Sequence, residues 1–284
     1  MIRVADEVRE ASAAVALETT IVAHGFPAGE GLEVALESER RVREAGAVPA
    51  TIGVLDGEIR VGLTSDELEW FTADARKLGP RDLAACVASG ETGATTVGGT
   101  LAVCRQVGIR FLGTGGIGGV HRGDRFDVSA DLLQLASTQV VVTSSGVKSL
   151  LDVDATSELL ESLGVPVLGY RTGSLPRFYD AEGGPPVSQR VESAAEAAAI
   201  ANAHWELGGA GVLLANPPPR SIDVEALIDA ALDEAVALGT TGQPLTPFVL
   251  GRLHEESDGQ TLALNRELAA ANAGLAAAVA VAAA

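Results

Sequence analysis

The stretch IRFLGTGGIGGVHRGDRFDVSADLLQLASTQVVVTSSG, residues 109–146, decides the fold. It opens with a short apolar run, continues through five glycines within seven residues (113–119), and ends with a second apolar run, QVVVTSSG. Short apolar runs that are bounded by turn residues are typical of strands buried in an α/β sheet. The stretch therefore predicts strands at 109–113 and 139–146, each of which leads into a loop of small residues.

The rest of the chain continues this alternation of short apolar runs with amphipathic stretches. Asp56-Gly57 separates two strand-like runs, which is a strong hairpin signal, and SDELEWFTADA (65–75) begins like a capped helix. We expect one α/β domain over residues 1–284, with a mixed, mostly parallel sheet flanked by helices. Further strands are predicted at 15–23, 165–170 and 210–216, and helices at 32–45, 95–107, 157–164, 193–208 and 261–284.

Composition excludes several classes of partner. The chain has 20 basic and 38 acidic residues, a net charge of −18, which disfavours nucleic acid and anionic membranes as partners. Only 4% of the residues are aromatic, so Ala, Val and Leu must build the core. Cys86 and Cys104 lie in apolar sequence, where a reduced, buried pair is expected. The chain starts without a signal peptide and its apolar tail is too short to span a bilayer, so we expect a cytoplasmic protein.

The glycine-rich loop is the first candidate site. Such loops bring backbone N–H groups close to a ligand, although the spacing is neither a P-loop nor a dinucleotide fingerprint. His121, Arg122, Asp127, Ser129 and Asp131 follow at once, a mixture suited to proton transfer, phosphate binding and a hard cation. The alternative is a polar surface loop in which Ser129 or Asp131 caps a helix.

Lys148 lies just past the strand QVVVTSS, at the edge of the sheet where α/β proteins bind their ligands. A desolvated amine there can attack a carbonyl group. The alternative is a surface lysine on the first turn of a helix. Lys77 and Lys148 are the only lysines in a chain that otherwise uses arginine, which favours a chemical role for Lys148.

Glu18 stands inside the apolar run VALETTIVA, where a carboxylate is costly unless it is paired or protonated. A protonated carboxyl can act as a general acid, whereas a paired one makes a structural ion pair. His24 follows as either a ligand contact or a loop histidine. Asn216 and Asn265 are either orienting amides or structural residues.

Taken together, these motifs resemble the pseudouridine-5′-phosphate glycosidase family, also called the indigoidine synthase A-like family. The resemblance covers nearly the whole chain, and the series TGGIGGVHRG, DVSADL and GVKS is its most specific part. The motifs are ALETTIVAHGFP, PRDL with GATTV, TGGIGGVHRG, DVSADL, SGVKSLLD, GVPVLGY, ANPPP, TPF and NRELAAANA.

The resemblance implies a role for each matching residue. Lys148 in GVKS corresponds to the Schiff-base lysine, and Glu18 in LETT corresponds to the proton donor. Asp127 corresponds to the ligand of a divalent metal, usually Mn²⁺. His121 and Asn265 match positions that are important to catalysis. The implied substrate contacts are Lys77, Val97, Ser129, Ala130 and Asp131.

The family's activity is then the expected function. The resemblance implies reversible cleavage of the carbon–carbon glycosidic bond of pseudouridine 5′-phosphate, giving uracil and ribose 5-phosphate through a Schiff base on Lys148. It also implies a three-layer α/β/α fold and a homotrimer. Two alternatives are a lysine-dependent lyase or aldolase on another sugar phosphate, and a non-catalytic sugar-phosphate-binding protein. Glu18, Asp127 and Lys148 favour an enzyme, because binding alone needs no reactive amine.

Three positions depart from the family pattern. Gly31 stands where the family usually has asparagine, and Gly79-Pro80 replaces Ser-Arg before the RDL motif. The family's CAG before the lysine motif is Ser144-Ser145-Gly146 in this chain.

Overall fold

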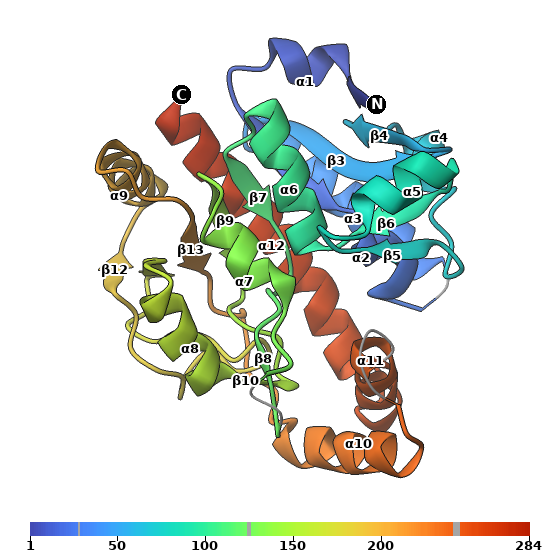
Figure 1. Ribbon diagram of the computed structural model, residues 1–284. Coiled ribbons are helices and arrows are strands. Elements are labelled where there is room, and N and C mark those ends of the chain that lie inside the picture. The colour runs from blue at the N-terminus through green and yellow to red at the C-terminus, as the bar shows by residue number, and fades with distance from the viewer. Residues whose placement is uncertain (28, 124–125, 241–244) are drawn as a thin grey trace.

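The structure is a computed structural model, and it describes residues 1–27, 29–123, 126–240 and 245–284. Within these residues eleven strands form one sheet (Figure 1). The strands are β1 (Ile2–Val4), β2 (Ala14–Glu18), β3 (Val48–Leu55), β4 (Glu58–Val61), β5 (Arg76–Leu78), β6 (Gly93–Thr95), β7 (Phe111–Gly113), β9 (Val141–Ser144), β11 (Val167–Tyr170), β12 (Gln189–Val191) and β13 (Val212–Ala215). A small second sheet pairs β8 (Val120–His121) with β10 (Leu151–Asp152).

The main sheet has the strand order β1-β4-β3-β2-β7-β9-β13-β11-β12, with β6 and β5 attached to β3. All pairs from β3 through β2 to β12 are parallel, whereas β3 pairs antiparallel with β4 and β6. The sheet is therefore mixed and mostly parallel, which confirms the prediction. The central strands are buried on both faces, as expected for parallel strands between helices.

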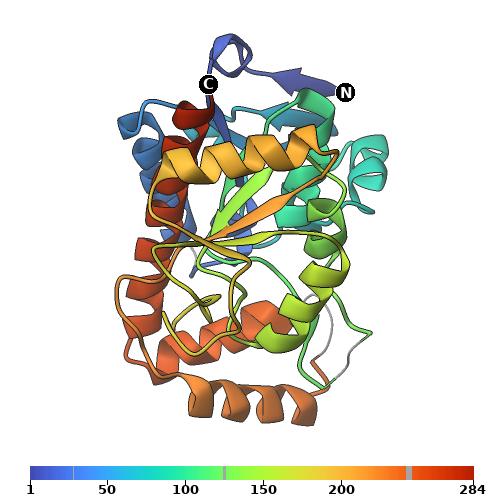
Figure 2. The same cartoon turned by 90° about the vertical axis from the view of Figure 1, so that its left-hand side faces the viewer.

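Helices cover both faces of the sheet and the edge where the parallel strands end (Figures 1 and 2). They are α1 (Asp6–Glu10), α2 (Thr20–His24), α3 (Glu30–Glu44), α4 (Ser65–Leu68), α5 (Leu83–Ser89), α6 (Val97–Val107), α7 (Ala130–Leu135), α8 (Val153–Ser162), α9 (Ala194–Glu206), α10 (Glu225–Ala237), α11 (Leu245–Glu256) and α12 (Gln260–Ala283).

Alternate residues of the central strands supply two separate cores. Ala16, Leu112 and Val142 face α6, α7 and α8, because successive side chains of a strand point to opposite faces. Leu17 and Val141 belong to the other core, with α3, α9 and α12. Helices, sheet and helices thus form the three layers of an α/β/α fold.

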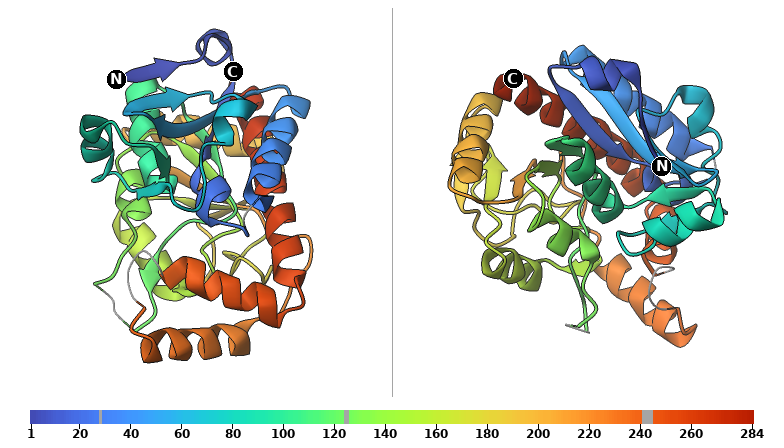
Figure 3. Two further views of the ribbon diagram at one scale, coloured as in Figure 1. Left: turned by 90° about the vertical axis from the view of Figure 1, so that its right-hand side faces the viewer. Right: turned by 45° about the horizontal axis from the view of Figure 1, so that its top comes forward.

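Helix α12 passes behind the sheet between α3 and α9 and packs against both helices and against β2, β7 and β9 (Figures 1 and 3). Its alanines allow a close approach: a Cβ at Gly113 would lie 2.7 Å from Ala273 Cα. The helix has 24 residues and is apolar enough to cross a membrane by length and composition, although half of its most apolar window is buried. This burial shows that α12 is a core helix of the fold.

Several predicted elements differ from the observed ones. The run 15–23 is not one strand, because β2 ends at Glu18 and α2 begins at Thr20. A short apolar run cannot distinguish strand from helix by periodicity alone. The helix in 65–75 is only one turn, and the residue that caps it is Thr64, in a capping box with Glu67.

Other local predictions are confirmed. Asp56 and Gly57 both have positive φ, 49° and 76°, as a tight hairpin turn between β3 and β4 requires. The helices predicted at 32–45, 95–107, 157–164, 193–208 and 261–284 all form, with shifted ends. Cys86 and Cys104 are buried and free.

Candidate active site

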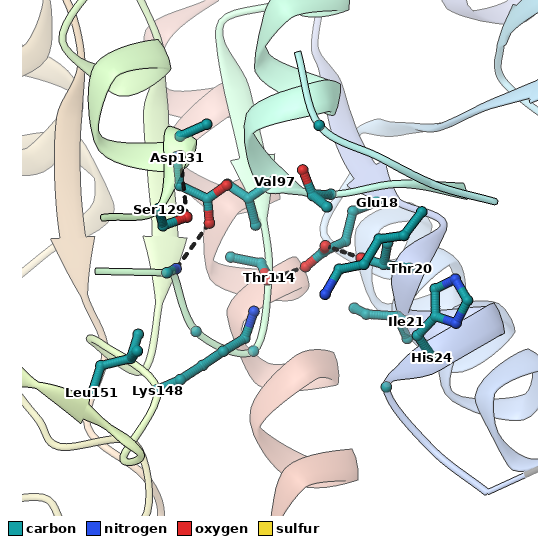
Figure 4. Close-up of a pocket in the computed structure, with 18 of the residues that line it drawn as sticks. Glu18, Thr20, Ile21, His24, Val97, Thr114, Ser129, Asp131, Lys148 and Leu151 are labelled. Carbon is teal, nitrogen blue, oxygen red and sulfur yellow. Dashed lines mark hydrogen bonds between the residues drawn. The ribbon is translucent and has the colours of Figure 1, made fainter. Parts of the chain in front are cut away.

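A cavity of about 490 Å³ opens at the carboxyl ends of β2, β7 and β9 (Figure 4). Register aligns these ends, because Leu17 pairs with Gly113 and Gly113 pairs with Thr143. Ligands of open α/β sheets bind at this edge. All ten residues predicted for the site line the cavity: Glu18, Lys77, Val97, His121, Asp127, Ser129, Ala130, Asp131, Lys148 and Asn265.

The glycine-rich loop and the Lys148 loop form a backbone ladder that continues the β7–β9 pairing. The N–H of Ser145 donates to Gly115 O at 2.9 Å, and the N–H of Ile117 donates to Gly146 O at 3.1 Å. The N–H of Lys148 then donates to Ile117 O at 3.1 Å. Farther along, His121 pairs with Leu151 in the small sheet. The loop that carries Lys148 is therefore fixed by backbone hydrogen bonds rather than left free.

Lys148 does not lie on a helix, so the surface-helix alternative is wrong. It is half-buried in the loop before β10, and its side chain extends toward Thr114 and the Glu18 carboxyl (Figure 4). The first helix after it, α8, begins only at Val153.

Glu18 is 5% exposed at the end of β2. The hydroxyl of Thr114 donates to its Oε1 at 2.5 Å, and the hydroxyl of Thr20 donates to its Oε2. No basic side chain of the described residues lies within ion-pair distance of the Glu18 carboxyl. The alternative that Glu18 forms a structural ion pair is therefore wrong. Two hydroxyls hold the carboxyl at the cavity wall.

Lys77, on β5, brings the second lysine of the chain to the same cavity. Burial lowers the pKa of Lys77, the charge of Lys148 lowers it further, and Glu18 and Asp131 act in the opposite direction. Lys148 therefore lies close enough to act electrostatically on Lys77, with carboxylates nearby to offset the charge.

His24 ends α2 beside this pair. Burial and then the charge of Lys77 lower its pKa, which favours the neutral ring. Its Nε2 is buried without a hydrogen-bond partner among the described residues, yet it lines the cavity. The sequence left His24 as either a ligand contact or a loop histidine, and this placement favours the ligand contact.

Asp131 organises the loop instead of pointing freely into the cavity. Its Oδ1 accepts from the N–H of Gly98 at 2.7 Å, and its Oδ2 accepts from the N–H of Gly118 at 2.8 Å. The carboxylate thus joins the first turn of α6 to the glycine-rich loop. Ser129 is the N-cap of α7 and accepts from the N–H of Asp131 at 3.3 Å, so the predicted capping role is present as well.

His121 and Asp127 form the part of the site best suited to a cation. Nδ1 of His121 lies 3.9 Å from Oδ2 of Asp127, and the Asp127 carboxylate is half-exposed. The described residues contain no group of three or more metal-ligating side chains. A hard divalent ion commonly uses one or two carboxylates together with water and substrate oxygens, which this site can supply. Positions 124 and 125, between His121 and Asp127, lie outside the described residues.

The sequence left open whether Asn265 and Asn216 orient the substrate or are structural, and the structure separates the two residues. Asn265 lines the cavity from α12, whereas Asn216 donates to Asn272 Oδ1 at 2.9 Å. Asn272 in turn donates to Thr114 O at 2.8 Å and to Ser145 Oγ at 3.1 Å. Asn216 is therefore structural, and Asn272, which sequence reasoning missed, ties α12 to both loops.

The departures from the family pattern have local explanations. A Cβ at Gly31 would lie 2.4 Å from Val22 O, so α2 and α3 touch at this point. Gly79 and Pro80 lie at the cavity rim, where the N–H of Gly79 donates to Asp82 at 3.0 Å. Ser144 and Ser145, which replace the first two residues of CAG, are both fully buried: the hydroxyl of Ser144 donates to Gly146 O at 3.0 Å, and Ser145 Oγ accepts from Asn272 at 3.1 Å.

Comparison with known proteins agrees with these motifs. A family profile described as "Indigoidine synthase A like protein" matches residues 3–282. The chain is 47% identical over 278 residues to a pseudouridine-5′-phosphate glycosidase of Herpetosiphon aurantiacus, covering 94% of this chain and 92% of the relative. It is also 47% identical to the protein of that name from a Nocardioides species, covering 98% and 94%.

Two solved structures are similar over nearly their whole length. An indigoidine synthase A-like protein from Thermotoga maritima has a TM-score of 0.91 at 37% identity, covering 99% of this chain and 96% of the other. The prealnumycin C-glycosynthase AlnA, solved in complex with ribulose 5-phosphate, has a TM-score of 0.88 at 39% identity, covering 100% and 97%. The α/β/α fold predicted from the resemblance is confirmed. The chain belongs to the indigoidine synthase A-like family.

Proposed function

We propose that this protein is a pseudouridine-5′-phosphate glycosidase, which reversibly cleaves its substrate to uracil and ribose 5-phosphate. The observation that carries the proposal is that an amine, Lys148, and a buried carboxyl, Glu18, line one cavity, with Thr114 hydrogen-bonded to the carboxyl. The names of the relatives supply the substrate, because proteins 47% identical to this chain are called pseudouridine-5′-phosphate glycosidases.

A carbon leaving group needs a route for the bonding electrons, and a lysine adduct provides one. Glu18 gives a proton to the ribose ring oxygen as the bond between this oxygen and C1′ breaks. The amine of Lys148 forms a bond to C1′. The nitrogen of the adduct gives one proton to the Glu18 carboxylate. Its lone pair then forms a C=N bond as the bond from C1′ to uracil C5 breaks, and C5 takes up that proton. Water hydrolyses the imine and releases ribose 5-phosphate and the free lysine.

The hydroxyls around Glu18 suit this role. After Glu18 has given up its proton, the hydroxyls of Thr20 and Thr114 each donate to one oxygen of the carboxylate. Hydrogen bonds to an ionised group stabilise it more than they stabilise a neutral partner. His121 and Asn265 reach the same cavity from β8 and α12 and are proposed to orient the substrate.

The substrate phosphate requires a cation, and Lys77 is the best candidate. The N–H of Gly118 in the glycine-rich loop already donates to Asp131, so it is not free to hold a phosphate. The remaining proposed contacts, Val97, Ser129 and Ala130, line the same wall of the cavity.

We also propose a divalent metal, Mn²⁺, held by Asp127 with His121 nearby. When bound, the ion would polarise or fix substrate oxygens and would keep water ligands. The residues fit a hard cation with few protein ligands, because the Asp127 carboxylate is accessible and faces His121. A homotrimer is proposed from the family resemblance, and light scattering of the purified protein tests it.

The decisive experiment is borohydride reduction in the presence of ribose 5-phosphate. Because the chain has only two lysines, peptide mass spectrometry separates an adduct on Lys148 from one on Lys77. We expect a sugar adduct on Lys148, with none in Lys148→Ala. Cleavage activity that is retained by the Lys148→Ala variant would contradict the mechanism. Glu18→Gln is expected to slow turnover by about 10²–10⁴-fold.

A lysine-dependent lyase or synthase on another sugar phosphate is the second candidate. The observation in its favour is that the structurally similar AlnA is named a C-glycosynthase and was solved with ribulose 5-phosphate. Direct comparison of pseudouridine 5′-phosphate with other C-glycosides, and of ribose 5-phosphate with ribulose 5-phosphate, separates the two candidates.

A further inference from the structure

Phe178 has a backbone conformation that an aromatic residue rarely adopts. Its φ is 65°, in the left-handed region that favours glycine, and the side chain is only 2% exposed. A bulky residue persists in this region only where its surroundings enforce the conformation, and such positions cluster at functional sites. The residue lies between β11 and β12, far in sequence from every residue proposed for the site.

The surroundings of Phe178 are the Lys148 loop itself. The N–H of Phe178 donates to Ser145 O at 3.1 Å, and Arg177 pairs with Gly146 as an antiparallel bridge. The ring packs edge-to-face on Tyr179, with centroids 4.7 Å apart and planes at 79°. The left-handed turn is thus bonded directly to the residues that precede Lys148.

The turn points the Phe178 ring into the cavity wall beside the lysine. A Cβ on Gly116 would lie 2.6 Å from Phe178 Cδ2 and 3.4 Å from Lys148 Cγ. The ring and the stem of the lysine therefore flank the same glycine, which has no side chain to separate them. Phe178 lines the cavity together with Gly115, Gly116 and Lys148.

We propose that Phe178 is a positioning residue for Lys148. The ring closes one side of the space around the lysine stem, so that the flexible chain is held in the arrangement that extends its amine toward Thr114 and Glu18 (Figure 4). The backbone of the Lys148 loop is already fixed, and the ring fixes the side chain that the loop carries. The inference rests on the proposed function, because it assigns Phe178 to the step in which Lys148 attacks the sugar.

The test uses two ring deletions in the full-length enzyme, Phe178→Ala and Phe178→Gly. Both remove the ring, but glycine adopts the left-handed conformation without strain, so the pair separates the ring from the backbone. The control is Phe71→Ala, which deletes a ring of the same 2% exposure in a different core cluster. The readouts are the rate of borohydride-trapped adduct formation on Lys148 in a single turnover, kcat and KM, and the melting temperature.

We expect both deletions to slow trapping by about tenfold or more with little change in KM, because small misplacements of a reacting group reduce rate strongly. Phe178→Gly should melt at a higher temperature than Phe178→Ala yet be equally slow. Phe71→Ala should lower the melting temperature and leave the trapping rate unchanged.

Wild-type trapping rates in both deletions, or in Phe178→Gly alone, would overturn the inference, since the ring would then have no role in the reaction. If both lose cooperative melting, Phe178→Leu provides the same test, because it keeps apolar volume without the flat ring. A wild-type enzyme that traps no sugar on Lys148 overturns the proposed function itself, which is a different result from normal trapping by the variants.

Discussion

The hydroxyl of Thr114 lies 2.5 Å from Oε1 of Glu18 and links the ends of two neighbouring parallel strands. β2 ends at Glu18 and β7 ends at Gly113, and the register of the pair sets the two side chains next to each other. Asn272 of α12 donates to the backbone carbonyl of Thr114 at 2.8 Å. The carboxyl proposed as proton donor is thus oriented by the sheet and by the core helix together.

Thr114→Val is expected to slow cleavage of pseudouridine 5′-phosphate by about tenfold or more. The variant keeps the shape of the side chain and removes a hydrogen bond to an ionised group, which is worth roughly 1.5–3 kcal/mol. Steady-state kinetics should show the loss in kcat rather than in KM.

Thr143→Val is the matched control for this change. Thr143 is a fully buried threonine on the adjacent β9, and its hydroxyl has no hydrogen-bond partner in the part of the chain that the structure describes. Its replacement should leave kcat unchanged. Equal effects of the two variants would show that buried threonines matter here for packing alone.

Lys77→Met should stabilise the protein while weakening substrate binding. The pKa of Lys77 lies below its ordinary value of 10.5, first because of burial and then because of Lys148. Between the folded-state pKa and 10.5 the unfolded chain binds more protons than the folded one, so stability rises with pH in that window. Removing the lysine removes this penalty.

Urea unfolding at several pH values tests the sign of this linkage. Lys77→Met should exceed the wild type in free energy of unfolding at pH 7, and the difference should shrink as pH approaches 10.5. KM for pseudouridine 5′-phosphate should rise about tenfold or more if the lysine holds the phosphate. A constant stability difference across this range would mean that the charge of Lys77 is not the cause.

The local sequence pattern was sufficient to predict most of the strands and helices. The central strands and the long helices follow from apolar periodicity, and Asp56-Gly57 marks its hairpin because both residues adopt positive φ. The prediction of a single strand at 15–23 is wrong, because an apolar run of nine residues fits either a strand or a helix. Its division after Glu18 depends on tertiary contacts: Thr19 donates to Ile52 O at 2.8 Å and accepts from the N–H of Thr95 at 2.9 Å.

The sequence was sufficient to predict those residues of the candidate site whose type alone indicates a chemical role. Lys148 and Glu18 stand out because a lysine is rare in this chain and a carboxylate is costly in an apolar strand. Thr114, Asn272 and Phe178 carry no such signal, since their roles depend on partners 96, 158 and 33 positions away in sequence (Glu18, Thr114 and Ser145). Only the folded arrangement brings these pairs together.

Asp131→Asn should reduce both stability and activity. The carboxylate accepts two backbone N–H bonds, from Gly98 and Gly118, and an asparagine would turn an N–H₂ donor toward one of them. We expect a loss of about 2 kcal/mol in the free energy of unfolding. The exposed Asp66 is the control, since a surface change of this kind costs less than about 0.5 kcal/mol. An Asp131→Asn protein as stable as Asp66→Asn would show that the junction of α6 and the loop does not need the charge.

Asp127→Asn should weaken Mn²⁺ binding by about 10-fold or more, because it removes the only carboxylate proposed as a ligand. Electron paramagnetic resonance of free Mn²⁺ measures binding directly, without depending on turnover. The fold should be unaffected, since the Asp127 side chain is half-exposed. His121→Ala is expected to have the smaller effect. Undiminished Mn²⁺ binding by Asp127→Asn would place the ion elsewhere.

Gly31 offers a test of how closely α2 and α3 pack. A Cβ there would lie 2.4 Å from Val22 O and 2.6 Å from Ile21 O, so any side chain must push apart the helix that carries His24. Gly31→Ala should cost about 1–3 kcal/mol of stability, and Gly31→Asn, the residue usual in the family, should cost more. Gly251→Ala, on α11 with open space around it, should be neutral or stabilising by about 0.5–1 kcal/mol. Chemical denaturation of the three variants measures these differences in the free energy of unfolding. If Gly31→Asn is as stable as the wild type, α2 and α3 can separate without cost. The close contact at Gly31 then does not determine the position of His24 in the cavity.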